Sequence, residues 1–237
     1  MICGIEWFEA AFRELDGAMS FRWSCRDGER LHANDEVCRL SGRARAILTG
    51  ERTALNFLQT LSATATAADA FVAAIGGTGA KILDTRKTLP GLRFAQKYAV
   101  QCGGAFNHRF GLFDAVLIKE NHIHVLGSLD RAIECLAAYQ DSVPTEIEVE
   151  TIAQAERALH SRAGRLLLDN FSIEMMREAV ALRDRIAPDK ELEASGGITL
   201  QNVREVAETG VDYVSVGDMT KSIAAVDFSL RVVDEVG

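Results

Sequence analysis

The chain has 237 residues, of which 48% are hydrophobic and 25% charged, and its formal net charge is -8 at pH 7. This length suits one large α/β domain, or a medium domain with a smaller one attached. The acidic balance argues against a nucleic-acid partner, and five scattered cysteines without a CxxC pair indicate reduced thiols. Because no hydrophobic run approaches the ~20 residues of a membrane span, we expect a cytoplasmic protein with no membrane partner.

The first part of the chain has its own pattern. Residues 21–48 alternate polar and hydrophobic side chains around two glycine-containing turns, which predicts short antiparallel strands. A helix is predicted from Glu51 to about Ile75, because leucines recur there at spacings of three, and Thr49 is its expected N-cap. The glycine-rich residues 76–79 are predicted to form the turn that ends this helix.

From residue 80 onward, short hydrophobic segments alternate with helical patterns. Strands are predicted within residues 80–87, 114–122, 145–150, 165–171, 190–197 and 212–220. Helices are predicted between most of them, at residues 92–100, 129–139, 152–160, 173–186 and 200–209. This alternation predicts a parallel sheet. Polar residues follow each strand at its carboxyl end, which favours a barrel, with a doubly wound open sheet as the alternative.

Cationic residues gather at the ends of successive predicted strands and loops. They are Arg86, Lys87, His108, Arg109 and Lys119, with Arg52 near the start of the first long helix. A single pair of this kind would be expected in any solvated loop, but three groups in successive units favour a binding site. Arginine suits bidentate binding of carboxylate or phosphate, and lysine supplies a compact charge. We therefore predict a ligand with more than one anionic group.

Acidic residues fall on the same predicted edge. Glu146, Glu148 and Glu150 alternate with hydrophobic residues, which places their side chains on one face of a strand. Strands of a parallel barrel are largely buried, so a carboxylate there requires a cation or a metal. Asp169 follows three leucines and has the same character. Glu148 and Asp169 are suited to hold Mg²⁺, ribose hydroxyls, or both.

Two glycine loops complete the pattern. Ser195, Gly196 and Gly197 lie between a strand and a helix whose N-cap region is predicted at Thr199, and Gly217 repeats the arrangement one unit later. Backbone N–H groups at a helix start bind phosphate, and barrels often place such sites after their last two strands. The residues therefore predict an enzyme that acts on a phosphorylated sugar together with a carboxylated compound.

Several segments, taken together, resemble one known family. The segments ERTALNFLQTLS, ILDTRKTLPGLR, NHRFGLFDAVLIKENH and GVDYVSVGDMTKS, with EIEVE, LLLDNF and SGGI between them, resemble quinolinate phosphoribosyltransferases over nearly the whole chain. The resemblance implies an α/β fold, an open seven-stranded TIM-like barrel over residues 57–221 beside a small, N-terminally shortened α/β domain over 1–56. Residues 222–237 are expected to pack on that small domain.

The resemblance also implies an activity and an assembly. Quinolinate and phosphoribosyl pyrophosphate would give nicotinate mononucleotide, pyrophosphate and CO₂ in de novo NAD synthesis, with Mg²⁺ as cofactor. The expected assembly is a homodimer with shared active sites, or a higher oligomer built from it.

Roles for individual residues follow from the same resemblance. Quinolinate would be bound by Arg86, His108, Arg109 and Lys119, with Thr85 beside them and with Arg52 supplied by the partner subunit. Lys87 would lie between the two substrates. The phosphoribosyl side would use Lys87, Lys119, Glu148 and Asp169, which form the expected catalytic set, with Ser195, Gly196, Gly197 and Gly217 around phosphate. The metal ligands would be Glu148 and Asp169.

The chain also departs from the family pattern. It begins later than the pattern does, so the N-terminal helices that help to cover the site are expected to be absent. The alternatives are therefore a truncated or divergent paralogue that binds phosphoribosyl or carboxylate ligands without this activity, including the paralogues found in molybdate-transport loci. The intact ERTALNF, NHR and LIKENH segments favour the enzyme.

Overall fold

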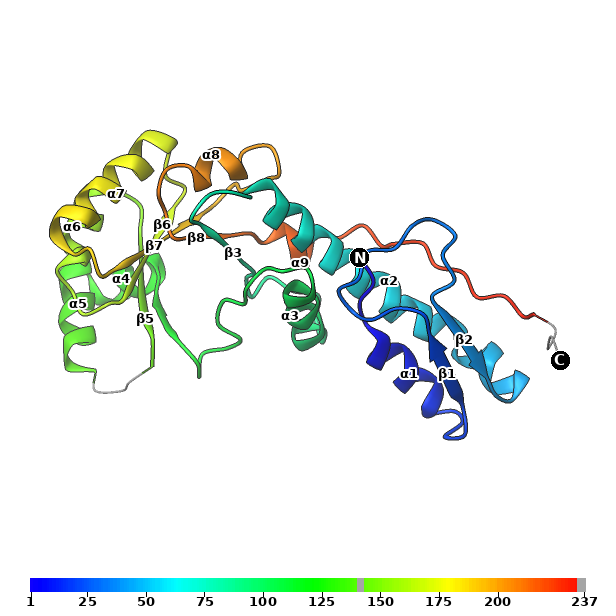
Figure 1. Ribbon diagram of the computed structural model, residues 1–237. Helices are drawn as coiled ribbons and strands as arrows, with labels where there is room; N and C mark the ends of the chain where they lie inside the picture. Colours follow the sequence, from blue (N-terminus) through cyan, green and yellow to red (C-terminus); the bar gives the residue numbers. More distant parts are fainter. Residues whose placement is uncertain (140–142, 234–237) are drawn as a thin grey trace.

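A parallel sheet forms the centre of the protein. The computed structural model describes residues 1–139 and 143–233 (Figure 1). The strands are β3 (Lys81–Leu83), β4 (Val116–Ile118), β5 (Thr145–Val149), β6 (Arg165–Asp169), β7 (Glu191–Ser195) and β8 (Tyr213–Ser215). Their order is β3-β8-β7-β6-β5-β4, and all pairs are parallel. All six predicted strands and the parallel pairing are confirmed.

A further segment pairs with the outer edge of β3. Phe106 forms an isolated parallel bridge with Leu83. Its N–H donates to Ile82 O at 2.9 Å, and its carbonyl accepts from Asp84 N at 3.0 Å. The two edges of the sheet are therefore the Phe106 segment and β4, and residues 107–115 run from one edge to the other.

Helices follow most of the strands, and α5, α6 and α7 cover the outer side of the sheet (Figure 1). They are α3 (Arg93–Cys102), α4 (Glu120–Leu126), α5 (Leu129–Ala138), α6 (Ile152–Leu159), α7 (Ile173–Ile186), α8 (Val203–Ala207) and α9 (Asp218–Lys221). The predicted helices are confirmed, and α4 and α9 were not predicted. The expected N-cap region at Thr199 is wrong, because α8 begins only at Val203, after a turn in which Thr199 N donates to Asn202 Oδ1.

The two faces of the sheet have opposite chemistry. Ile147, Val149, Leu166, Leu168 and Leu192 are fully buried in the hydrophobic core shared with the outer helices. Side chains of a strand alternate between faces, so the residues between them lie on the inner face. Most of these inner residues are charged in β5, β6 and β7, and Leu167 and Ser195 are the uncharged exceptions. The charged ones are Glu146, Glu148, Arg165, Asp169, Glu191 and Glu193. The inner face therefore carries most of the charged side chains of these strands.

A smaller unit lies beside the sheet. It contains α1 (Ile5–Arg13), the antiparallel pair β1 (Ser20–Trp23) and β2 (Cys38–Ser41), and part of α2 (Ala44–Ala74). The predicted antiparallel strands are confirmed, whereas α1 was not predicted. A second core here joins Phe8 and Phe12 of α1 to Leu55 and Leu58 of α2, with Phe228 and Leu230 of the C-terminal segment packed against it.

Helix α2 connects the two parts. Its later residues, such as Phe71, lie in the core of the sheet, and the predicted boundary at residue 56 falls inside the helix, so the division into domains stays a prediction. The expected N-cap Thr49 is wrong, since the helix begins at Ala44 and the Thr49 hydroxyl donates to Arg45 O at 2.7 Å within it. The predicted turn after the helix is confirmed, because Ile75 ends it and Gly77 has φ 85°. Among the described helices, none combines the length and hydrophobicity needed to cross a membrane.

Candidate active site

Lys119 and Glu148 meet at the carboxyl edge of the sheet. Lys119 Nζ lies 3.2 Å from Glu148 Oε2, and the Glu148 side chain is only 5% exposed. Helix α4 starts at this point, and Glu120 N donates to Glu148 Oε1 at 3.4 Å. Asp169 lies close by, and its pKa is raised by burial and by the charge of Glu148. Two adjacent carboxylates at a sheet edge are suited to a divalent cation.

Thr85, Lys87 and Gly217 come together at the carboxyl ends of the neighbouring strands β3 and β8. Lys87 N donates to Thr85 Oγ1 at 3.1 Å, and Thr220 Oγ1 of α9 donates to Lys87 O at 2.8 Å. A Cβ added to Gly217 would lie 3.4 Å from Lys87 Cδ and 3.6 Å from Thr85 Oγ1. The loop after β3 and the turn after β8 therefore form one wall of the site.

A buried glutamine of α3 connects the loop after β3 to α9. Gln96 is fully buried; its Oε1 accepts from Leu89 N at 2.8 Å, and its Nε2 donates to Thr220 O at 2.7 Å. Sequence reasoning missed this residue, because a glutamine within a helical pattern carries no signal for contacts so distant in the chain.

The loop after β7 is tightly constrained at its first glycine. Asn170 N donates to Ser195 O at 2.9 Å, and Gly196 has φ 95°. A Cβ on Gly196 would lie 3.0 Å from Asn170 N. Gly197 has φ 62° and open space around it. Because α8 begins six residues further on, any phosphate bound here would meet the loop itself and not a helix start.

Gly196→Ala should destabilise the protein by about 2–3 kcal/mol, because the methyl group meets the side chain and backbone of Asn170 and the residue must keep a left-handed conformation. Gly197→Ala is the matched control and should cost only about 1 kcal/mol, since only the backbone conformation is unfavourable. Urea unfolding of both variants measures the difference. Equal losses would show that the approach of Asn170 does not constrain the loop.

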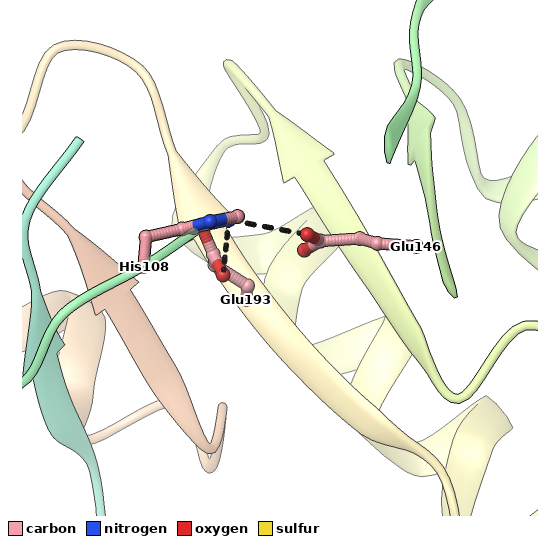
Figure 2. A group of neighbouring side chains, drawn as sticks. All are labelled: His108, Glu146 and Glu193. Atoms are coloured by element: carbon pink, nitrogen blue, oxygen red, sulfur yellow. Dashed lines mark ion pairs between the residues drawn. The ribbon is translucent and has the colours of Figure 1, made fainter. Parts of the chain in front are cut away.

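His108 lies on the inner face of the sheet between two glutamates (Figure 2). Its Nε2 is 3.1 Å from Glu146 Oε2 and 3.4 Å from Glu193 Oε2. Burial lowers the pKa of His108 and raises the pKa of Glu146 and of Glu193 to about 7 each. The next residue, Arg109, donates from NH1 to Ala115 O at 3.1 Å. Its pKa is lowered by burial and then by the charge of Arg86, so the two guanidinium groups are close.

A buried ion pair supports this loop from behind. Lys97 and Asp84 are both fully buried and form a short ion pair. Asp84 Oδ1 accepts from His108 N at 2.8 Å, and Lys97 Nζ donates to His108 O at 2.8 Å. Asn107 Nδ2 donates to Asp84 Oδ2 at 2.6 Å and completes the network. Lys97, in the middle of α3, thus holds the loop in place and is itself fully buried.

One predicted site residue lies apart from the others. Arg52 lies on α2 with its side chain 71% exposed, 4.0 Å from Glu51. Glu150, predicted to share a face with Glu146 and Glu148, is an exposed residue beyond the end of β5 and lines the same hollow as Glu148.

Sequence reasoning also missed two inner-face residues that a clear signal could have revealed. Glu191, Glu193 and Ser195 alternate along β7 as the glutamates of β5 do. Arg165 opens β6 and lies 3.2 Å from Glu193 and 2.8 Å from Glu191. Applying the two-residue alternation of side chains to every strand would have predicted that Arg165 and Glu193 lie on the same face as Glu146.

The fold and site define a class of protein. A parallel α/β sheet that gathers lysines, carboxylates and glycine loops at its carboxyl edge is typical of α/β enzymes that bind anionic ligands there.

Comparison with known proteins identifies the family. Models of the N-terminal and C-terminal domains of quinolinate phosphoribosyl transferase match residues 1–62 and 64–231. The carboxylating nicotinate-nucleotide pyrophosphorylase of Mycobacterium leprae is 42% identical over 232 residues, which cover 97% of this chain and 82% of that protein. The decarboxylating quinolinate phosphoribosyltransferase 1b of Nicotiana tabacum is 37% identical over all of this chain and 71% of its own. The chain belongs to the quinolinate phosphoribosyltransferase family.

Solved structures agree with this assignment. The nicotinate-nucleotide pyrophosphorylase from Francisella tularensis has a TM-score of 0.90 and 42% identity, covering 95% of this chain and 80% of that one. NadC from Streptococcus pyogenes also has a TM-score of 0.90, with 38% identity over 98% of this chain and 81% of its own.

Proposed function

We propose that the protein joins the ring nitrogen of quinolinate to the ribose of phosphoribosyl pyrophosphate and releases pyrophosphate and CO₂, forming nicotinate mononucleotide for NAD synthesis. The observation that carries this proposal is the family match across both domains. The Lys119–Glu148 pair supports it, because it sets a cation beside a buried carboxylate at the carboxyl edge of the sheet.

The residues of the site suit these two substrates. Arg86, Arg109 and Lys119 supply positive charge for the two carboxylates of quinolinate, with His108 beside them. Lys87 lies next to Gly217, so it can contact both the dicarboxylate and the phosphorylated sugar. Holding the ring nitrogen in line with the ribosyl carbon supplies an entropic advantage, and the lysines stabilise the departing pyrophosphate.

The second half of the reaction needs no protein nucleophile. Once the ring nitrogen is bonded to ribose, the ring is a pyridinium. The electron pair of the C–CO₂⁻ bond can then remain on the ring carbon beside the positive nitrogen as CO₂ leaves, and that carbon afterwards takes up a proton.

Mg²⁺ fits the donor set at the carboxyl edge. Glu148 and Asp169 would hold it, because the Glu148 charge already raises the pKa of Asp169, and a cation between them removes that repulsion. When bound, the ion supplies positive charge to the phosphate oxygens.

The finer architecture belongs to the same proposal. We place the Phe106 segment as the seventh strand of an open barrel, since it pairs in parallel with Leu83 on the free edge of β3. A reducing, cytoplasmic setting is supported by five free cysteines.

A homodimer with shared sites is supported by two surface features. Phe94, Leu112 and Phe113 are 73–75% exposed on α3 and the 107–115 loop, and exposed hydrophobic groups of this kind often mark protein interfaces. Arg52 is also exposed, in a part of α2 that packs with α1 and away from the inner face.

Mixed dimers test the role of Arg52. If the partner subunit supplies Arg52, mixing inactive Arg52→Ala and Lys119→Ala proteins should restore activity, because one site of each mixed dimer is then intact. Half of randomly formed dimers are mixed and half of their sites are intact, so about a quarter of wild-type activity is expected. No recovery after verified subunit exchange would mean that each subunit uses its own Arg52.

The activity itself is tested by incubating the purified protein with quinolinate, phosphoribosyl pyrophosphate and Mg²⁺. Nicotinate mononucleotide and CO₂ should form in equal amounts. Phthalate, which has both carboxylates but no ring nitrogen, is the matched control and should give no nucleotide. A folded protein that binds both substrates without forming product would instead be a ligand-binding paralogue.

A further inference from the structure

The backbone of His108 is fixed by buried groups. Its N–H donates to Asp84 Oδ1 and its carbonyl accepts from Lys97 Nζ, each at 2.8 Å. Both partners are fully buried. The position of the ring is therefore set by the surrounding chain before any ligand binds.

The hydrogen bonds of the ring define its tautomer. Arg109 N donates to His108 Nδ1 at 2.7 Å, so Nδ1 must carry a lone pair. In a neutral imidazole the proton is then on Nε2. That N–H points to Glu146 Oε2 at 3.1 Å and to Glu193 Oε2 at 3.4 Å (Figure 2). Burial lowers the pKa of His108, which keeps the ring neutral.

The same geometry argues against a metal at this cluster. His108, Glu146 and Glu193 are metal-ligating residue types, and their ligand atoms lie within 4.8 Å of one another. A metal needs a lone pair on the imidazole, however. Nδ1 uses its lone pair for the Arg109 N–H, and Nε2 carries the proton. The three side chains therefore form a hydrogen-bonded cluster and not a coordination site.

The two glutamates are costly for the fold. Both are buried, and their Oε1 atoms have no hydrogen-bond partner among the described residues. Hydrophobic residues of similar volume are often as stable or more stable at such positions, and unsatisfied buried oxygens in a native structure require an explanation. Glu193 also contacts Arg165 at 3.2 Å. Glu146 Oε2 lies 3.1 Å from His108 Nε2, and the carboxyl groups of Glu146 and Glu193 are close enough to share a hydrogen bond.

We propose that Glu146 and Glu193 are positioning residues of the quinolinate site. They fix His108 as a neutral Nε2–H imidazole and thereby fix the backbone N–H of Arg109. This inference rests on the proposed function for its kinetic consequence only. The dicarboxylate then meets a neutral histidine of fixed orientation, and its charge is balanced by the arginines and Lys119. Because Arg109 N–H is bound to the ring, a ring that turns also moves the residue that carries the guanidinium.

The tautomer can be measured directly in the free protein. ¹⁵N NMR of the histidine rings, with His108 assigned through His108→Gln, should show an Nε2–H tautomer with a slowly exchanging ring proton. Glu146→Leu removes the nearest acceptor and should shift that proton and speed its exchange, and Glu146→Gln, which retains an acceptor oxygen, should restore the slow exchange. Glu191→Leu is the matched control, since it alters the same inner face beside Arg165 without contacting His108. An Nδ1–H tautomer in the wild type would overturn the proposal even if no variant folded.

Steady-state kinetics measure the consequence for the substrate. Glu146→Leu should raise the KM for quinolinate about 10-fold, the value of one lost hydrogen bond, and leave the KM for phosphoribosyl pyrophosphate and kcat unchanged. Glu146→Gln should recover most of this loss. An equal change in both KM values, or in kcat alone, would overturn the positioning role. A wild-type protein that shows the Nε2–H tautomer but forms no nucleotide would instead count against the proposed function.

Discussion

Replacing Lys119 with alanine should lower kcat about 100- to 1,000-fold, the range seen when one preorganised charge-stabilising group is removed from an active site. Lys119 Nζ is held 3.2 Å from a carboxylate that is only 5% exposed. Its loss removes a cation from the edge where we propose that pyrophosphate departs, and leaves Glu148 with an uncompensated charge. Nicotinate mononucleotide formation at saturating substrates measures the effect.

Two controls separate this role from a general loss of charge. Lys119→Arg retains the positive charge on a longer, planar group and should recover part of kcat. Arg131→Ala removes an exposed cation of α5 that lies 3.5 Å from Glu134, and it should leave kcat unchanged. Wild-type turnover in a folded Lys119→Ala protein would exclude Lys119 from the reaction.

The strands of the sheet could be predicted because each combines a hydrophobic run with an abrupt polar end. Leu166 to Leu168, for example, are followed at once by Asp169. Helix α1 was missed although Phe8 and Phe12 have helical spacing, because the short segment forms its core only against α2 and β1. The start of α2 was misplaced because a favourable N-cap residue, Thr49, outweighed the helix-forming residues before it. Ala46 is buried and Ile47 packs against the core of the small unit, and this packing extends the helix to them.

The site was predictable where it depends on topology alone. Parallel strands end at one edge, so Lys119, Glu148 and Asp169 had to lie near one another. The surroundings of His108 depend on how residues 107–115 cross from one edge of the sheet to the other, and no local pattern specifies that path. For the same reason, no local pattern reveals that Asp84 and Lys97 form a buried pair.

Lys97→Met should reduce the free energy of unfolding by about 3–5 kcal/mol, the usual cost of removing one partner of a buried ion pair. The side chain is 0% exposed, and it donates to both Asp84 and His108 O. Methionine fills a similar volume, so the main loss is the uncompensated Asp84 carboxylate. Urea unfolding measures the change. Lys190→Met is the matched control, because Lys190 donates to the backbone carbonyls of Ser161 and Ala163 ahead of β6, and it should cost about 1 kcal/mol.

A second substitution tests whether the charge of Asp84 is the cause. Adding Asp84→Asn to Lys97→Met removes the buried charge and keeps an oxygen that can accept from His108 N, so it should restore about 1–2 kcal/mol. The Lys97–Asp84 pair also fixes the backbone of His108. The double variant lacks the hydrogen bond from Lys97 to His108 O, so it should still bind quinolinate weakly. Recovery of both stability and quinolinate binding would show that the ion pair neutralises charge only. Recovery of stability alone would show that it also places the histidine, because the fold would then be sound and the site still misaligned.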